Sequence, residues 1–264
     1  MRWDPAQYSR YADERGRAFL DLLARIDCAA PRRVVDVGCG PGNLTALLTQ
    51  RWPSALVEGL DSSPEMIARA STVDAVAFRV EDATAWTMPA DADVVISNAT
   101  LQWVPGHRDL LRGWAASLPA GGWLAFQVPG NFEAPSHTVM RALAESPRWA
   151  PLVGDVLRHH DAVGAPSDYA HLLLGAGLRA DVWETTYLHV LTGPDPVLEW
   201  VRGTGLRPVL AALAERPGPD GGDARPASES FEAEYAAALR LAYPPTPHGT
   251  LFAFRRIFAV GRKP

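Results

Sequence analysis

Residues 34–42 read VVDVGCGPG, in which three valines and an aspartate lead directly into three alternating glycines. The apolar residues predict a buried β-strand over 34–37, and the glycines predict a tight turn after it. Glycine turns follow strands in proteins that bind phosphates, dinucleotides and other nucleotide-like cofactors. The stretch therefore predicts a ligand of this kind at the end of the first strand.

Strands and helices alternate after this turn. Apolar runs predict strands at 56–60, 76–80, 93–97 and 123–128. Helical spacing and capping residues predict helices at 13–27, 43–51, 64–70 and 109–117. The alternation is typical of βαβ units, so we expect an α/β fold with a doubly wound, mostly parallel sheet. A strand over 180–191 and a final, antiparallel strand within 249–263 bring the sheet to seven strands.

The alternation stops after residue 128. Helical stretches follow at 136–176, 195–215 and 228–242, and the run RPGPDGGDARPAS at 216–228 predicts a surface loop. We expect one domain over 1–264, with a cofactor-binding half at 1–130. Helical cap insertions over 131–250, around the final strands, are expected on the substrate side.

The composition is that of an ordinary soluble globular protein. The chain has 264 residues, 47% of them hydrophobic and 21% charged, and a net charge of -5. An acidic chain without a basic stripe argues against binding to nucleic acids. Its two cysteines fit no metal-ligand spacing, and neither a leader segment nor a membrane-spanning run is visible. We therefore expect a cytoplasmic protein without a metal site, while the oligomeric state stays open and a monomer is compatible with the sequence.

The residues around the glycines select among the nucleotide-like ligands. A phosphate-binding P-loop is excluded, because Gly42 is followed by Asn43 and Leu44 rather than by a Lys-Ser/Thr pair. A dinucleotide loop has the spacing G-x-G-x-x-G, whereas here Gly38, Gly40 and Gly42 alternate. The carboxylate of Asp36 would repel a diphosphate but suits the ammonium and sulfonium of S-adenosylmethionine. The loop therefore favours S-adenosylmethionine as the cofactor.

Polar residues at the ends of the next strands support a nucleoside. Asp61 is placed to accept hydrogen bonds from ribose hydroxyls, Met66 to lie near the adenine face, and Asp82 with Ala83 to contact the adenine edge. Each also has a structural interpretation, as a helix cap, a core side chain or a solvated loop acid. The full set of predicted cofactor-binding residues is Asp36, Gly38, Cys39, Gly40, Asp61, Ser62, Met66, Asp82, Ala83, Asn98 and Trp103.

The motifs VVDVGCGPG, GLDSSPEMI, VEDATAW and VVISNATLQWV resemble those of class I S-adenosylmethionine-dependent methyltransferases. Other segments are similar to the trans-aconitate 2-methyltransferase family: WDPAQYSRYADERGRAFLDLLARI, QVPGNFEAPSHTVMRALA, DVWETTYLHVL, EWVRGTGLRP and FAFRRIFAVG. The resemblance implies a Rossmann-like methyltransferase fold and S-adenosylmethionine as cofactor. It also implies methyl esterification of one carboxylate of trans-aconitate, a small-molecule carboxylic acid substrate.

Such a reaction needs no general base, because a carboxylate is already ionised at neutral pH. We therefore expect no catalytic acid or base, and we expect arginines to hold the carboxylates that do not react. Arg15 and Arg207 are the first choices, and Arg202, Arg255 and Arg256 are lesser candidates. The predicted substrate-binding residues are Tyr11, Arg15, Phe132, His137, Trp183, Tyr187 and Arg207.

Three alternatives remain open on the sequence alone. In the first, the methyl acceptor is another acid, a phenol or an amine. In the second, the chain binds the cofactor but does not catalyse methyl transfer. In the third, Arg15 and His137 have structural roles only. A nucleic-acid methyltransferase is disfavoured, because the segment SNATLQW after the fourth strand lacks an N-P-P-Y-like tetrapeptide.

Overall fold

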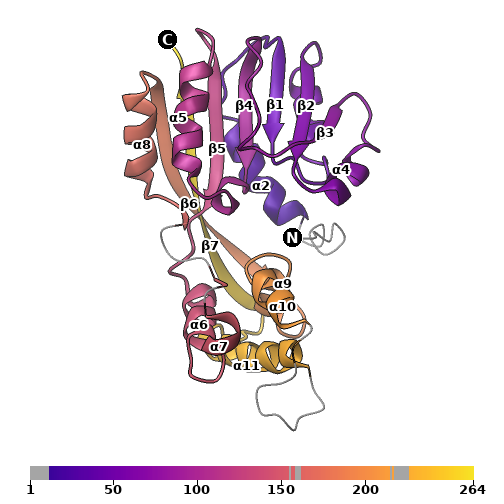
Figure 1. Cartoon of the computed structure of the whole chain (residues 1–264), viewed down its shortest axis with the longest axis vertical. Coiled ribbons are helices and arrows are strands. Elements are labelled where there is room, and N and C mark those ends of the chain that lie inside the picture. Colours follow the sequence, from indigo (N-terminus) through magenta and orange to yellow (C-terminus); the bar gives the residue numbers. More distant parts are fainter. Residues whose placement is uncertain (1–11, 155, 158–161, 215, 217–225) are drawn as a thin grey trace. The chain divides into compact units, whose positions relative to one another are not determined.

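A computed structural model describes residues 12–154, 156–157, 162–214, 216 and 226–264 (Figure 1). The chain divides into two compact units. The first unit comprises Met1–Gly130, Ala162–Thr185 and Arg255–Pro264, and the second comprises Asn131–Asp161 and Thr186–Phe254. The first boundary coincides with the expected end of the cofactor-binding half. The expected cap over 131–250, however, includes residues 162–185, which the structure places in the first unit; one domain with a cap stays a prediction.

A seven-stranded sheet has the order β3-β2-β1-β4-β5-β7-β6. Strands β1 to β5 pair in parallel, and β7 runs antiparallel to β5, which confirms the predicted doubly wound, mostly parallel fold. The order reverses beside β1, so the carboxyl ends of β1 and β4 flank the point where such sheets bind ligands. The strands are β1 (Arg33–Val37), β2 (Leu56–Asp61), β3 (Ala77–Val80), β4 (Ala92–Asn98), β5 (Trp123–Pro129), β6 (Arg179–Leu191) and β7 (Thr250–Arg262).

Helices cover both faces of the sheet in the first unit. They are α2 (Ala12–Leu23), α3 (Thr45–Arg51), α4 (Pro64–Ala70), α5 (His107–Ser117) and α8 (Pro166–Gly175), with a 3-10 turn η1 (Leu101–Trp103) after β4. Helix α2 packs on β5, while α5 packs against α8 and lies on the opposite face from α2 in Figure 1. The helix predicted over 13–27 ends earlier, at Leu23, because a turn with hydrogen bonds to Leu22 and Leu23 follows it.

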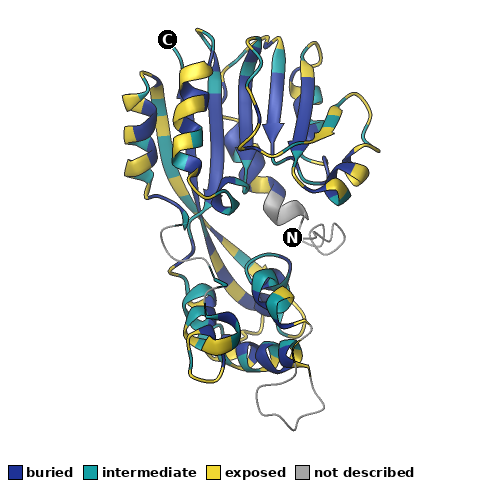
Figure 2. Cartoon of the chain, viewed as in Figure 1, coloured by how far each residue is buried: buried dark blue, intermediate teal, exposed yellow. Residues whose placement is uncertain are grey.

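The central strands form the core of the first unit. In Figure 2, β1, β4 and β5 are buried along most of their length, whereas β3 at the edge is largely exposed. Strands covered on both faces need apolar side chains on both, which explains the nearly continuous apolar runs in the sequence. Burial of Val34, Val35 and Val37 therefore fixes β1 at the centre.

The second unit is mostly helical. It contains α6 (Pro135–Ala144), α7 (Ala150–Val153), α9 (Pro196–Arg202), α10 (Arg207–Leu213), α11 (Ala227–Ala242) and the adjoining ends of β6 and β7. Its core holds Trp149, Trp200, Phe231, Tyr235 and Phe252. Most of the loop predicted at 216–228 lies outside the described residues, and its last two residues already belong to α11.

The glycine turn after β1 is held against β2. The N–H groups of Gly38 and Cys39 both donate to the carbonyl of Leu60, over 2.7 and 3.0 Å. Gly42 has φ = +80°, and a Cβ added there would lie 2.7 Å from the ring of Phe78 on β3. The third glycine thus serves close packing between the turn and the edge of the sheet, not only chain reversal.

Replacing Gly42 with alanine tests this packing. The φ of Gly121 is also +80°, but a Cβ there would meet nothing within 4 Å, so Gly121→Ala is the matched control for backbone strain alone. We expect Gly42→Ala to lower the free energy of unfolding by about 1–3 kcal/mol more than Gly121→Ala does. Urea denaturation of both variants measures the difference, and equal losses would mean that Phe78 does not restrict position 42.

Candidate functional site

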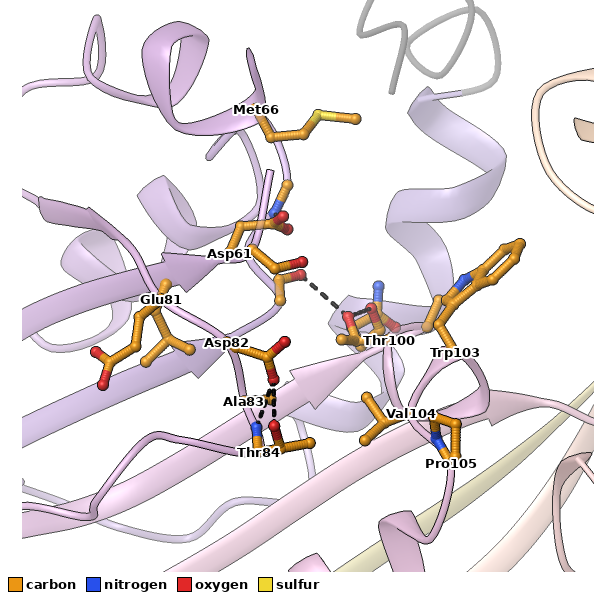
Figure 3. A pocket seen from close by; sticks show the side chains of 16 residues that line it. Asp61, Met66, Glu81, Asp82, Ala83, Thr84, Thr100, Trp103, Val104 and Pro105 are labelled. Carbon is orange, nitrogen blue, oxygen red and sulfur yellow. Dashed lines mark hydrogen bonds between the residues drawn. The ribbon is translucent and has the colours of Figure 1, made fainter. Parts of the chain in front are cut away.

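A pocket opens at the carboxyl ends of β1, β2 and β4 in the first unit (Figure 3). Its empty space, part of it open to solvent, is about 890 Å³. Asp61, Met66 and Asp82 approach it from one side, and Thr100, Trp103, Val104 and Pro105 from the other. The lining residues are Gly38, Gly40, Leu60, Asp61, Ser62, Met66, Glu81, Asp82, Ala83, Thr84, Asn98, Ala99, Thr100, Trp103, Val104 and Pro105.

The glycine turn leaves room for a ligand at one position. Gly40 has φ = +56° and lines the pocket, and a Cβ added to it would meet no atom within 4 Å. Gly38, in contrast, lies directly under Thr100, whose hydroxyl donates to the Gly38 carbonyl over 3.1 Å. At Gly40 the turn therefore exposes backbone to the pocket with space beside it. At Gly38 the side chain of Thr100 occupies the space that a Cβ would need.

The carboxylate of Asp61 connects this turn to helix α4. Its Oδ2 accepts a hydrogen bond from Gly40 N–H and its Oδ1 accepts one from Ser63 N–H, both over 2.9 Å. Ser63 is the N-cap of α4 and accepts from Met66 N–H in turn. Burial raises the pKa of Asp61, while the two backbone hydrogen bonds oppose that shift. Each carboxylate oxygen has a second lone pair for a ligand hydroxyl.

Asp36 lies beneath the turn rather than in the pocket wall. It is buried, and its Oδ2 accepts a hydrogen bond of 2.7 Å from the hydroxyl of Thr45, the first residue of α3. Burial raises its pKa to about 7; the hydrogen bond from Thr45 opposes this shift and the negative charge of Asp61 adds to it. Asp36 therefore interacts electrostatically with Asp61, which lines the pocket.

The end of β3 supplies a second acidic residue. Asp82 accepts hydrogen bonds from the N–H and the hydroxyl of Thr84, over 2.8 and 2.7 Å, and both reach Oδ1. These bonds lower its pKa, so it stays ionised. Neither of these two bonds uses Oδ2 of Asp82, so this oxygen can accept a hydrogen bond from a ligand. Met66, on the same side of the pocket, is buried and offers an apolar surface.

The chain after β4 adopts an uncommon conformation. Ala99 has φ = +55°, a region that costs an alanine roughly 1–2 kcal/mol. Two hydrogen bonds hold it there, from Ala99 N–H to the carbonyl of Gln127 over 2.9 Å and from Gln102 Nε2 to the carbonyl of Ala99 over 2.6 Å. Strained residues that the surroundings hold in place are concentrated at ligand sites.

The structure brings most of the predicted cofactor-binding residues together. Nine line the pocket: Gly38, Gly40, Asp61, Ser62, Met66, Asp82, Ala83, Asn98 and Trp103. Asp36 and Cys39 do not, because Asp36 turns toward Thr45 and the Cys39 sulfur is buried against Gly59 of β2. Sequence reasoning missed Leu60, Glu81, Thr84, Ala99, Thr100, Val104 and Pro105. Most of these adjoin predicted residues, which is the signal that could have found them.

The predicted substrate residues are distributed over both units. Trp183, in the first unit, does not line this pocket: its ring stacks on Phe258 at 4.8 Å between centroids, with the Arg25 guanidinium 5.1 Å from it. In the second unit, the ring of Phe132 lies 5.4 Å from that of His137, the buried Tyr187 lies near His189, and Arg207 begins α10. Tyr11 and the side chain of Arg15 lie outside the described residues.

The lesser arginine candidates have partners in the structure. Arg202 pairs with Glu199 and Glu232 in the second unit. Arg255 pairs with Glu184 and donates to the carbonyl of Gly130. Arg256 is buried and donates to the side chain of Gln127 over 3.2 Å. Each of the three therefore already has a polar partner within the protein.

The described residues offer neither a metal site nor a membrane-spanning helix. They contain no cluster of three or more His, Cys, Asp or Glu side chains that could hold a metal ion. No helix among them is both long and apolar enough to cross a membrane.

The sequence is similar to a known protein family over most of its length. A family model described as a methyltransferase domain matches residues 8–180. The trans-aconitate 2-methyltransferase of Streptomyces avermitilis is 53% identical over 99% of this chain and 97% of that protein. Those of Streptomyces coelicolor and Rhodococcus jostii are 55% and 53% identical, over 99% and 98% of this chain and 87% and 99% of their own lengths.

Solved structures agree on the fold. The YcgJ protein of Bacillus subtilis is 17% identical, with a TM-score of 0.57 over 94% of this chain and 98% of its own. A geranyl diphosphate C-methyltransferase of Streptomyces coelicolor, solved with S-adenosyl-L-homocysteine, is 14% identical, with a TM-score of 0.52 over 98% and 82%. The sequence matches show that the chain belongs to the methyltransferases, in the family of the trans-aconitate 2-methyltransferases.

Proposed function

We propose that this protein transfers a methyl group from S-adenosylmethionine to one carboxylate of trans-aconitate, giving a monomethyl ester. The observation that carries the proposal is the pocket at the ends of β1 to β4, lined by an open glycine backbone and two carboxylates. Relatives named trans-aconitate 2-methyltransferase that match nearly the whole chain support the choice of acceptor. The cytoplasm stays the expected location.

The pocket's donors and acceptors fit S-adenosylmethionine. Asp61 would accept from the ribose hydroxyls, and Asp82 Oδ2 from the adenine amino group with Ala83 N–H beside it. Met66 would lie against the adenine face, and Gly40 leaves space where a side chain would block the cofactor. When bound, S-adenosylmethionine supplies a methyl group on a sulfonium, and its transfer to a carboxylate oxygen leaves S-adenosylhomocysteine.

The chain's task in this reaction is to hold the acceptor carboxylate in line with the methyl group of the sulfonium. The acceptor carboxylate is ionised and needs no base, so orientation is the main source of rate enhancement. Arginines would hold the carboxylates that do not react. Tyr11, Arg15, Phe132, His137, Trp183, Tyr187 and Arg207 stay predictions for this role.

An assay with methyl-labelled S-adenosylmethionine tests the proposed function. The acceptors are trans-aconitate, other polycarboxylates, phenols and amines, offered separately to the purified protein. We expect label transfer to trans-aconitate in a product that mild base hydrolyses, because an ester is base-labile. A base-stable ether or N-methyl product would replace the proposed acceptor, and binding of the cofactor without turnover on any acceptor would indicate a non-catalytic module.

Asp61→Asn tests cofactor recognition. An amide offers one acceptor oxygen and would place NH₂ against a backbone N–H or a ribose hydroxyl. Hydrogen bonds to charged groups contribute about 1.5–3 kcal/mol, so we expect the Kd for S-adenosylmethionine to rise at least about tenfold. Glu81→Gln is the matched control, because Glu81 also lines the pocket but is paired with Arg79 at 2.6 Å. Calorimetric titration that finds equal affinities for both variants would refute the role of Asp61.

The pH dependence of cofactor binding tests Asp36. A pKa of about 7 means that Asp36 is largely protonated below pH 7 in the free protein. A cation in the pocket favours the carboxylate, so binding below pH 7 releases a proton, and affinity should rise with pH by up to about tenfold per unit until Asp36 is ionised. Titrations from pH 5.5 to 8.5 should show this rise in the wild type and a flatter profile in Asp36→Asn. Superimposable profiles would exclude Asp36 as the titrating group.

A further inference from the structure

Two buried polar atoms at the adjoining ends of β4 and β5 have no hydrogen-bond partner among the described residues. They are Oδ1 of Asn98, an acceptor on a residue that lines the pocket, and Nε2 of Gln127, a donor. Gln127 is 0% exposed. Buried polar groups are paired in the great majority of cases, so each exception calls for a ligand or a bound water.

The orientation of the Gln127 amide is fixed by its neighbour. Arg256, on β7, is 5% exposed, and its Nη1 donates to Oε1 of Gln127 over 3.2 Å. A guanidinium only donates hydrogen bonds, so the amide oxygen must face Arg256 and the NH₂ group must face away. Withdrawal of electrons from the oxygen by the positive charge makes the N–H groups stronger donors.

Gln127 does not itself line the pocket, but the register of the sheet places it next to the lining residue Asn98. Gln127 on β5 is the partner of Asn98 on β4, and partners in parallel strands send their side chains to the same face. Asn98 lines the pocket, so the Gln127 side chain leaves the sheet one strand away on the same face. The backbone carbonyl of Gln127 also accepts from Ala99 N–H and so holds the strained pocket residue.

The reaction chemistry favours a donor of this kind for the attacking carboxylate. Transfer to a carboxylate joins an anion to a cation, and the charge on both decreases in the transition state. A direct ion pair with an arginine would stabilise the reactants more than the transition state and slow the step. A neutral N–H donor orients the oxygen with less of this penalty, while Arg256 acts one group further away.

We propose, on the basis of the proposed function, that Gln127 Nε2 donates a hydrogen bond to the reacting carboxylate of the acceptor, and that Arg256 is a positioning residue that fixes the Gln127 amide. The polar end of β4 and β5 is then the part of the site that recognises the carboxylate, while Asp61 and Asp82 recognise the nucleoside.

Gln127→Glu tests the donor. Glutamate has the same size and still accepts from Arg256, so the fold is kept, but it replaces the N–H donor with an anionic oxygen that repels a carboxylate. We expect the Kd of trans-aconitate, titrated into protein saturated with S-adenosylhomocysteine, and the KM for trans-aconitate to rise at least about tenfold. The Kd of S-adenosylmethionine should change less than about twofold.

Ser97→Ala is the matched control. Ser97 is a buried polar residue of β4 at the same edge, but its hydroxyl already donates to the carbonyl of Val37 over 2.8 Å. Its loss should lower stability and leave both constants for trans-aconitate within about twofold of wild type. Arg256→Met, which frees the amide to rotate, should raise the KM for the acid, and an added guanidinium salt should partly restore it.

The outcomes separate the inference from the proposed function. If the wild type methylates trans-aconitate and Gln127→Glu binds the acid as tightly, the role of Gln127 is wrong and the proposed function stands. If Gln127→Glu and Ser97→Ala raise the KM equally, the effect is structural and the inference also fails. A wild type that neither binds nor methylates a carboxylic acid contradicts both.

Discussion

The carboxylate of Asp61 is the interaction on which the site depends. Its two oxygens accept from Gly40 N–H and Ser63 N–H, and so join the turn after β1 to the start of α4 across the neighbouring strand. The Leu60 carbonyl next to it accepts from Gly38 and Cys39. Leu60 and Asp61, at the end of β2, thus fix the glycine turn. Asp61 itself lines the pocket that the turn borders, where its remaining lone pairs can accept hydrogen bonds.

Charge explains how the rest of the pocket is arranged around this carboxylate. Burial raises the pKa of both Asp36 and Asp61, and the negative charge of Asp61 raises that of Asp36 further. Such a pair of acids is destabilising in an apolar site unless a cation joins it. A ligand with an ammonium and a sulfonium meets this need, whereas a diphosphate would make it worse. The same electrostatics that favoured S-adenosylmethionine on the sequence therefore remain after Asp36 is found beneath the turn.

The sequence predicted the parts of this protein that follow local rules. Val34–Val37 and the other apolar runs gave the strands, and the positions directly after them gave Asp61, Asp82 and Asn98, because strand ends of a parallel sheet meet at one edge. It did not predict the direction of the Asp36 side chain, which depends on the hydroxyl of Thr45 nine residues away. Nor could it predict positive φ at Ala99, since alanine carries no signal for that conformation.

The sequence also could not predict contacts between segments that lie far apart in the chain. The sequence predicted Trp183 as a substrate-binding residue, yet its ring stacks on Phe258 of the neighbouring strand and does not line the pocket. The pairing of Gln127 with Arg256 joins residues 129 positions apart, and only the register of β5 with β7 and β4 reveals it. Single-sequence reasoning named Arg256 as a lesser candidate but had no means of linking it to Gln127.

A crystal structure of the protein with S-adenosylhomocysteine and trans-aconitate tests the central claim most directly. The account predicts the ribose hydroxyls on Asp61, the adenine between Met66 and Asp82, and a carboxylate of the acid beyond the cofactor sulfur. A cofactor bound outside the pocket lined by Gly40 and Asp61, or bound there without contact to Asp61, would contradict it.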